Sequence, residues 1–237
     1  MSNEETKNGD IIFVGGSKGG VGKSFFSCAV LDYLRNQKKE NPFLIESDTS
    51  NPDVYKSYHT LVDHKLLNLD VKDGWMALND LADTEALRQR PIVVSTGSRN
   101  NIGVSKFGSN LNIGVKELQR KLTVFWVIDR DIDSLELLMD FREVMTEATI
   151  HVVMNEHFGE QNRFELYADS DLKKSIESSG GQSIAFPDVA DRVAYALRNK
   201  RMPIEVAVSE MALGNRVELT RWRNEVTQLF NGVLRTS

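Results

Sequence analysis

A glycine-rich stretch near the N-terminus carries the residue types that bind phosphate. It reads "IIFVGGSKGGVGKS" (residues 11–24), in which β-favouring residues precede glycines, lysines and serines. The glycines of "GGVG" allow a backbone whose N–H groups converge on an anion, while Lys23 can reach terminal phosphates and Ser24 can bind Mg²⁺. A helix that begins near Ser24 adds the positive end of its dipole. The stretch therefore predicts a nucleoside triphosphate site rather than an ordinary glycine-rich turn.

The loop departs from the general phosphate-loop pattern at two positions. The pattern G-x-x-x-x-G-K-[ST] asks for glycine at position 17, where this chain has Ser17. The pattern needs one lysine, and Lys18 adds a second. With that second lysine, "KGGVGKS" resembles the deviant phosphate-binding loop of the ParA and MinD family of ATPases, to which nitrogenase iron protein is also related.

The resemblance implies that the second lysine acts in a dimer. In this family the early lysine, here Lys18, is the signature lysine, which crosses the interface to the nucleotide of the other subunit while Lys23 serves its own. A cation delivered from a partner stabilises phosphate charge only when two subunits meet, as an arginine finger does. The resemblance thus implies an ATP-dependent homodimer with ATP and Mg²⁺ as cofactors. The alternative for Lys18 is a solvated loop lysine.

Acidic residues follow the second predicted strand in "FLIESDTSNPDVY". In the ParA-like family this place holds the switch I segment. Asp48 matches its second acid, which positions or activates the attacking water, and Glu46 matches the first. Carboxylates there can also hold Mg²⁺ or its waters, so Ser24 and Asp48 are the predicted metal ligands and Glu46 is a further candidate. The alternative for this segment is a turn and helix cap over residues 48–52.

The third predicted strand lacks the acid on which the family pattern ends. In "PIVVSTGSRNN", Ser95 stands where an aspartate that holds a magnesium-bound water is expected, and Gly97 stands where a proline is expected. A neutral hydroxyl adds no charge, so we expect either compensation by Glu46 or Asp48, or weaker metal binding. Slow ATP hydrolysis is the expected consequence. A nucleotide-binding module that hardly hydrolyses ATP is the alternative.

Two later segments resemble the base-binding elements of the family. Asn155 ends the fifth predicted strand, where relatives commonly place an asparagine on the adenine edge, and "FPDVADRV" resembles the segment that packs on the base, with Pro187 and Val189 as its apolar wall. A polar turn after a buried strand is the alternative for Asn155. The predicted nucleotide-binding residues are Ser17, Lys18, Gly19, Gly20, Val21, Gly22, Lys23, Ser24, Phe25, Asn155 and Pro187, and the predicted catalytic residues are Lys18, Lys23 and Asp48.

Strands and helices must alternate to bring these residues to one edge of a sheet. Short β-branched apolar runs do alternate with longer amphipathic stretches, which predicts a three-layer α/β/α fold with a mostly parallel central sheet. The expected strands cover residues 11–14, 42–45, 92–94, 122–128, 149–154 and, more weakly, 182–186. The expected helices cover residues 24–39, 75–88, 133–146, 190–201, 204–213 and 218–234.

Length and composition predict a single domain. With the resemblance, this is one P-loop ATPase domain over residues 1–237, with a flexible N-terminus at 1–9 and a helical C-terminal part at 187–237. Residues 97–111 are rich in glycine and asparagine and are expected to form a mobile loop. The net charge of −5 argues against a general polyanion binder. One cysteine, Cys28, and the absence of a long apolar run indicate a cytoplasmic protein without a membrane segment.

From Ile11 to about Trp222 the order of segments resembles the plasmid stability and conjugation branch of the family, with proteins of the TraL, StbB and MobD type. The segments "FPD", "WVIDRDIDSLELL" and "LGNRVELTRW" carry this resemblance. It implies a role in plasmid partition or in conjugative DNA mobilisation, with a DNA-binding adaptor or a relaxase as protein partner.

C-terminal basic residues such as Arg221 and Arg223 could bind DNA directly and without sequence specificity. The glutamates interspersed among them favour a solvated helix face instead. An apolar stripe on the last helix more often packs on its own domain than on a membrane, so membrane binding is not expected. The sequence therefore predicts a molecular switch that binds ATP, hydrolyses it slowly and dimerises on it. A metabolite kinase or synthetase of the same fold is the alternative, although no convincing acid and lysine for a metabolite stand out.

Overall fold

The computed structural model describes residues 8–16, 18–97 and 101–234. Within these residues the chain builds one sheet of seven strands in the order β3-β2-β4-β1-β5-β6-β7, with every neighbouring pair parallel. The strands are β1 (Ile11–Gly16), β2 (Phe43–Glu46), β3 (Asp63–Leu66), β4 (Ile92–Ser95), β5 (Leu122–Ile128), β6 (Ala148–Asn155) and β7 (Ser183–Phe186). Ser17 lies outside the described residues, as do residues 1–7 of the expected flexible N-terminus.

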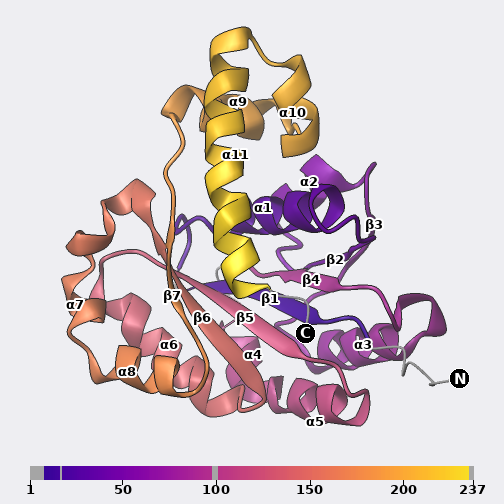
Figure 1. Ribbon diagram of the computed structural model, residues 1–237. Coiled ribbons are helices and arrows are strands. Elements are labelled where there is room, and N and C mark those ends of the chain that lie inside the picture. The colour runs from indigo at the N-terminus through magenta and orange to yellow at the C-terminus, as the bar shows by residue number, and fades with distance from the viewer. Residues whose placement is uncertain (1–7, 17, 98–100, 235–237) are drawn as a thin grey trace, which may run out of the picture.

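Helices follow the strands and cover both faces of the sheet (Figure 1). They are α1 (Lys23–Asn36), α2 (Asp53–Tyr58), α3 (Lys72–Asp83), α4 (Asn101–Phe107), α5 (Ser109–Glu117), α6 (Ile132–Val144), α7 (Glu165–Ala168), α8 (Asp171–Ser178), α9 (Asp191–Lys200), α10 (Ile204–Glu210) and α11 (Leu213–Val233). Short 3₁₀ turns stand at Glu85–Leu87, Glu156–Phe158 and Gln161–Arg163.

Alternation of side chains along each strand produces two cores. In β1, Ile11 and Phe13 pack against α3, α5 and α6, whereas Ile12 and Val14 pack on the opposite face against α1 and α11. Figure 1 shows the same division, with α3, α4, α5 and α6 on one side of the sheet and α1, α2, α9, α10 and α11 on the other. Strands that are buried on both faces read as continuous apolar runs, which is why the sequence predicts them well. The predicted three-layer fold is confirmed.

Two expectations about local structure were wrong. β3, with the sequence "DHKL", was not expected because it is a polar edge strand whose side chains are mostly exposed. Residues 101–107 and 109–111 are helical rather than a mobile loop. Their glycines serve close packing, since a Cβ atom at Gly103 would lie 1.8 Å from the carbonyl oxygen of Leu69. Residues 98–100 of that segment lie outside the described residues.

The N-terminal and C-terminal ends of the described chain differ slightly from expectation. Asn8 and Gly9, which were expected to be flexible, make hydrogen bonds to the backbone carbonyls of Leu118 and Arg88. The last helix, α11, begins at Leu213, five residues earlier than the expected helix, and its buried residues pack over α1.

An ion pair ties α11 to α1, the helix that follows the phosphate loop. The Arg223 guanidinium donates to both carboxylate oxygens of Asp32, at 2.7 and 2.9 Å, and Asp32 is 3% exposed. Burial raises the pKa of Asp32, and the bonds from Arg223 oppose that rise. The C-terminal helix therefore supplies the charge that makes a buried carboxylate in α1 tolerable.

Removing that charge should destabilise the fold. We expect Arg223→Met to lower the free energy of unfolding by about 3 kcal/mol, because Asp32 would be left buried without its partner. Arg221→Met is the matched control on the same helix, since Arg221 is about half exposed and bonds Glu218 and Glu225 at the surface; it should cost under about 1 kcal/mol. Urea denaturation measures both, and equal losses would contradict the structural role of the Asp32–Arg223 pair.

Candidate functional site

Four strands deliver polar residues to one edge of the sheet. β1 runs into the phosphate loop, β2 ends at Glu46, β4 ends at Ser95 and β6 ends at Asn155. Their registers place Glu46 beside Ser95 and Ser95 beside Val14, all on the face that α1 covers. Parallel α/β sheets bind ligands beyond the carboxyl ends of their strands, so this edge is the candidate site.

The phosphate loop has the backbone that its glycines permit. Gly20 and Gly22 adopt φ values of 87° and 104°, in the left-handed region that other residues rarely enter. A Cβ atom at Gly22 would also lie 2.4 Å from Nδ2 of Asn155. α1 begins immediately afterwards at Lys23, and Ser24 stands in its first turn. The loop therefore leads directly into a helix N-terminus, as an anion site requires.

Lys23 is buried at the base of this loop. Its side chain is 6% exposed and its Nζ atom donates to the Lys18 carbonyl at 2.7 Å. Burial lowers the pKa of Lys23 to about 8, and the negative charge of Asp48 opposes that shift. A buried ammonium group with a carbonyl partner gains from a nearby anion such as a phosphate.

Lys18 is held differently, by two carboxylates that follow β5. Its Nζ atom makes an ion pair with Asp131 and lies 3.3 Å from Oδ2 of Asp129. These carboxylates, Asp131 above all, raise the pKa of Lys18, whose side chain is 40% exposed. Neither Asp129 nor Asp131 was expected to have a role in the site. Their place in "DRDIDS", directly after a buried strand at the nucleotide edge, is the signal that could have found them.

Glu46, the last residue of β2, and Asp48, two residues later, have different structural roles. Glu46 is 1% exposed, and its carboxylate accepts backbone N–H bonds from Asp48 and Val54 at 3.2 Å and from Tyr55 at 3.4 Å. Burial raises the pKa of Glu46 to about 7 although these bonds lower it. Asp48 accepts bonds from the hydroxyl of Ser50 and the N–H of Asn51. Glu46 thus fixes the backbone of the segment, and Asp48 shapes its turn.

The donors at this edge fit Mg²⁺. The Ser24 hydroxyl and the Asp48 carboxylate are hard oxygen ligands, and Mg²⁺ is usually bound by one or two protein ligands together with phosphate oxygens and waters. The Ser95 hydroxyl is buried and makes no hydrogen bond among the described residues, so it can accept or donate to a metal-bound water. The residues that the structure describes contain no group of three or more His, Cys, Asp or Glu side chains that could hold a metal ion.

A cavity of about 260 Å³ adjoins the loop. Phe25, Pro187 and Val189 give it apolar surface, and its polar lining includes His157 and Asp188, whose side chains lie 3.3 Å apart. The structure thus brings the expected Asn155, Pro187 and Phe25 together with Gly20, Gly22 and Ser24. The full lining is Gly20, Gly22, Ser24, Phe25, Cys28, Asp53, Ser57, Asn155, His157, Phe186, Pro187, Asp188, Val189, Ala194, Leu197, Arg198, Arg201, Met202 and Ile204.

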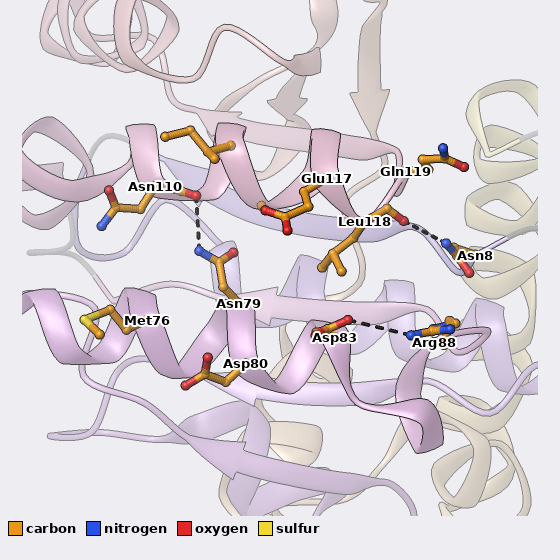
Figure 2. Close-up of a pocket in the computed structure, with 12 residues that line it drawn as sticks. Asn8, Met76, Asn79, Asp80, Asp83, Arg88, Asn110, Glu117, Leu118 and Gln119 are labelled. Atoms are coloured by element: carbon orange, nitrogen blue, oxygen red, sulfur yellow. Dashed lines mark hydrogen bonds and ion pairs between the residues drawn. The ribbon is translucent and has the colours of Figure 1, made fainter.

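A larger cavity, of about 640 Å³, lies away from the phosphate loop between α3 and α5 (Figure 2). Asn79 spans it by donating to the carbonyl of Asn110 at 3.1 Å, and an ion pair between Asp83 and Arg88 stands toward one end. The lining residues include none of the predicted nucleotide-binding or catalytic residues. We therefore place the candidate site at the smaller cavity, where the phosphate loop lies.

Two arginines of α11 have acidic partners. Arg221 bonds Glu218 and Glu225, and Arg223 bonds Asp32, so neither presents an unpaired charge to DNA. Arg221 lies on an exposed helix face, whereas the Arg223 side chain is 19% exposed and pairs with a buried acid of α1. Within the described part of the chain, no helix has the length and apolar character needed to span a membrane.

Comparison with known proteins identifies the family. Protein MobD of Acidithiobacillus ferrooxidans is 50% identical over 224 residues, which cover 94% of this chain and 97% of that protein. The chain belongs to the MobD family. No protein-family model matches it. This relationship confirms the resemblance to proteins of the MobD type that the sequence indicated.

Solved structures share the fold of this MobD-family chain at low sequence identity. MinD cell division protein of Aquifex aeolicus matches with a TM-score of 0.55 and 12% identity, over 92% of this chain and 97% of that one. A putative plasmid partition protein of Borrelia burgdorferi bound to AMPPNP matches with a TM-score of 0.55 and 14% identity, over 94% and 99%. MinD of Pyrococcus horikoshii with Mg-ADP has a TM-score of 0.52 and 11% identity, over 96% and 99%. The MinD and ParA type of fold is confirmed.

The buried carboxyl group of Glu46, which accepts the backbone hydrogen bonds of Asp48, Val54 and Tyr55, should make stability depend on pH. The folded protein keeps a proton on Glu46 up to about pH 7, whereas the ordinary pKa is 4.5, so this group lowers the free energy of unfolding as pH rises between those values. Glu46→Gln removes that loss. The difference in free energy of unfolding between the variant and wild type should therefore shift by about 2 kcal/mol in favour of the variant from about pH 5 to about pH 8.

Urea titrations at the two pH values measure this gain. Glu136→Gln, at an exposed position of α6, is the matched control and should shift stability equally at both. A difference between Glu46→Gln and wild type that stays constant with pH would show that Glu46 is ionised in the fold.

Proposed function

We propose that this chain is an ATP-binding switch that hydrolyses ATP slowly and dimerises when ATP is bound. The observation that carries the proposal is that the two lysines of one phosphate loop differ in burial and in their partners. Lys23 is buried beside its own site, whereas the Lys18 side chain is 40% exposed and pairs with the buried Asp129 and the exposed Asp131. An exposed lysine of the phosphate loop can reach a second subunit, which the buried Lys23 cannot.

The proposed roles follow from the geometry of the edge. The backbone of Gly19 to Gly22 and the Lys23 ammonium bind the phosphates, and Ser24 and Asp48 hold Mg²⁺, which neutralises phosphate charge when bound. Asp48 positions the attacking water. Lys18 stabilises the phosphates of the partner's nucleotide. The orphaned Ser95 hydroxyl in place of an acid supports slow rather than fast hydrolysis.

The base cavity supports a nucleoside triphosphate over a bare phosphate compound. Phe25, Pro187 and Val189 offer apolar surface for an aromatic base, next to the phosphate loop. The Borrelia protein of the same fold was solved with AMPPNP and the Pyrococcus protein with Mg-ADP. ATP and Mg²⁺ are therefore the proposed cofactors.

Membership of the MobD family supports a biological setting in plasmid stability or conjugative DNA transfer. In that setting the protein is cytoplasmic, and only the ATP-bound dimer presents the composite surface that a partner recognises. A DNA-binding adaptor or a relaxase is the proposed partner. Direct DNA binding is not favoured, because Arg221 and Arg223 of α11 pair with acids of this chain.

Dimerisation should depend on the nucleotide and turnover on Lys18. In sedimentation velocity with Mg²⁺ and a nonhydrolysable ATP analogue we expect a dimer, and with ADP a monomer. Lys18→Gln should retain ATP binding but reduce turnover by about 100-fold or more, because the partner's nucleotide loses its cation. Lys72→Gln, at an exposed position of α3, should change neither. Monomer with both nucleotides, together with unchanged turnover in Lys18→Gln, would refute the dimeric switch.

Water positioning should depend on Asp48. We expect Asp48→Ala to lower kcat by about 10² to 10⁴, with a smaller effect on KM, because the carboxylate acts on the attacking water. Asp73→Ala is the control, since Asp73 is exposed on α3 and is not among the residues that line the base cavity. Steady-state ATP turnover measures both variants. Wild-type turnover in Asp48→Ala would remove the assignment.

A further inference from the structure

Asn155, at the end of β6, is bonded through both ends of its amide. It is 7% exposed, its Nδ2 donates to the carbonyl of Val21 at 2.8 Å, and its Oδ1 accepts from the N–H of His157 at 3.2 Å. Val21 belongs to the phosphate loop, 134 residues earlier in the chain. The side chain thus links the end of β6 to the middle of the loop.

The same side chain also lies against the next residue of the loop. A Cβ atom at Gly22 would lie 2.4 Å from Nδ2 of Asn155, so the amide fills the space beside the Gly22 backbone. Val21 is itself buried in the core under α1. The turn at residues 21 and 22 is therefore fixed on one side by the core and on the other by Asn155.

One peptide group connects this bond to phosphate binding. The carbonyl of Val21 and the N–H of Gly22 belong to the same planar, trans peptide unit and point in opposite directions. Fixing the carbonyl toward Asn155 therefore directs the Gly22 N–H away from Asn155. In a phosphate loop the N–H groups before the lysine are the ones that contact the phosphates.

We propose that Asn155 is a positioning residue for the phosphate loop, which fixes the Val21–Gly22 peptide for phosphate binding whatever base the ligand carries. This inference rests on the proposed function, because it assumes a triphosphate ligand at the loop. It goes beyond a contact with the base. Asn155 contributes to affinity through the loop, so its effect extends to ligands that have no base.

Inorganic tripolyphosphate separates the two roles. Affinities of Mg-ATP and of Mg-tripolyphosphate are measured for wild type and for Asn155→Ala, by calorimetry or by competition. We expect the variant to weaken both by the same factor, about tenfold, which corresponds to one hydrogen bond. If Mg-ATP weakens while Mg-tripolyphosphate keeps its wild-type affinity, or if neither changes, the inference is wrong.

The chain offers a matched control. Asn112 in α5 is 9% exposed and makes the same kind of bonds away from the site, with Nδ2 donating to Val144 and Oδ1 accepting from Glu147. Asn112→Ala should lose a comparable amount of stability and leave both affinities unchanged. Asn155→Ser is the second variant should Asn155→Ala not fold, with the same expected result.

Hydrogen exchange distinguishes failure of this inference from failure of the proposed function. In protein without nucleotide, amides in peptides that cover residues 18–26 should exchange faster in Asn155→Ala than in wild type or in Asn112→Ala. If wild type binds neither ligand, the proposed function fails, and exchange alone decides whether Asn155 positions the loop. Unchanged exchange in those peptides would overturn the inference even if ATP binds.

Discussion

The buried ammonium group of Lys23 is the constraint around which the site is built. Removing a lysine from water is costly, and a carbonyl bond offsets that cost only in part. The group is held there because α1 is fixed from several sides: by the sheet beneath it and by α11, whose Arg223 bonds Asp32. Helix, loop and C-terminal helix thus cooperate to keep a positive charge where a phosphate would stabilise it.

The second lysine is in the opposite situation. Lys18 is exposed and has carboxylate partners in Asp129 and Asp131, so its charge is balanced without a ligand. For Lys18 to reach a nucleotide in another subunit, phosphate oxygens must replace these carboxylates. Both partners are anionic, so the exchange costs less than breaking an ion pair into water. The proposed dimer and the isolated chain therefore compete for the same cation.

Much of this arrangement could be predicted because it depends on local pattern. The buried strands appear as apolar runs, and Lys18, Lys23 and Ser24 stand in a short motif whose chemistry depends on spacing. β3 was missed because an edge strand needs few apolar residues, and α4 because glycines such as Gly103 serve close packing as well as turns. The bond of Lys18 to Asp131 joins residues 113 apart, so only the order of strands in the sheet brings them together.

The replacement of an acid by Ser95 becomes understandable from its neighbour. Glu46 and Ser95 are in register on adjacent strands and on the same face, and neighbouring strands lie about 4.8 Å apart. Glu46 is already buried, with burial and the charge of Asp48 raising its pKa. A second carboxylate at position 95 would raise the pKa of Glu46 further, because two adjacent buried acids cannot both ionise without repulsion. A hydroxyl at position 95 avoids that repulsion and leaves Asp48 as the acid proposed for metal and water.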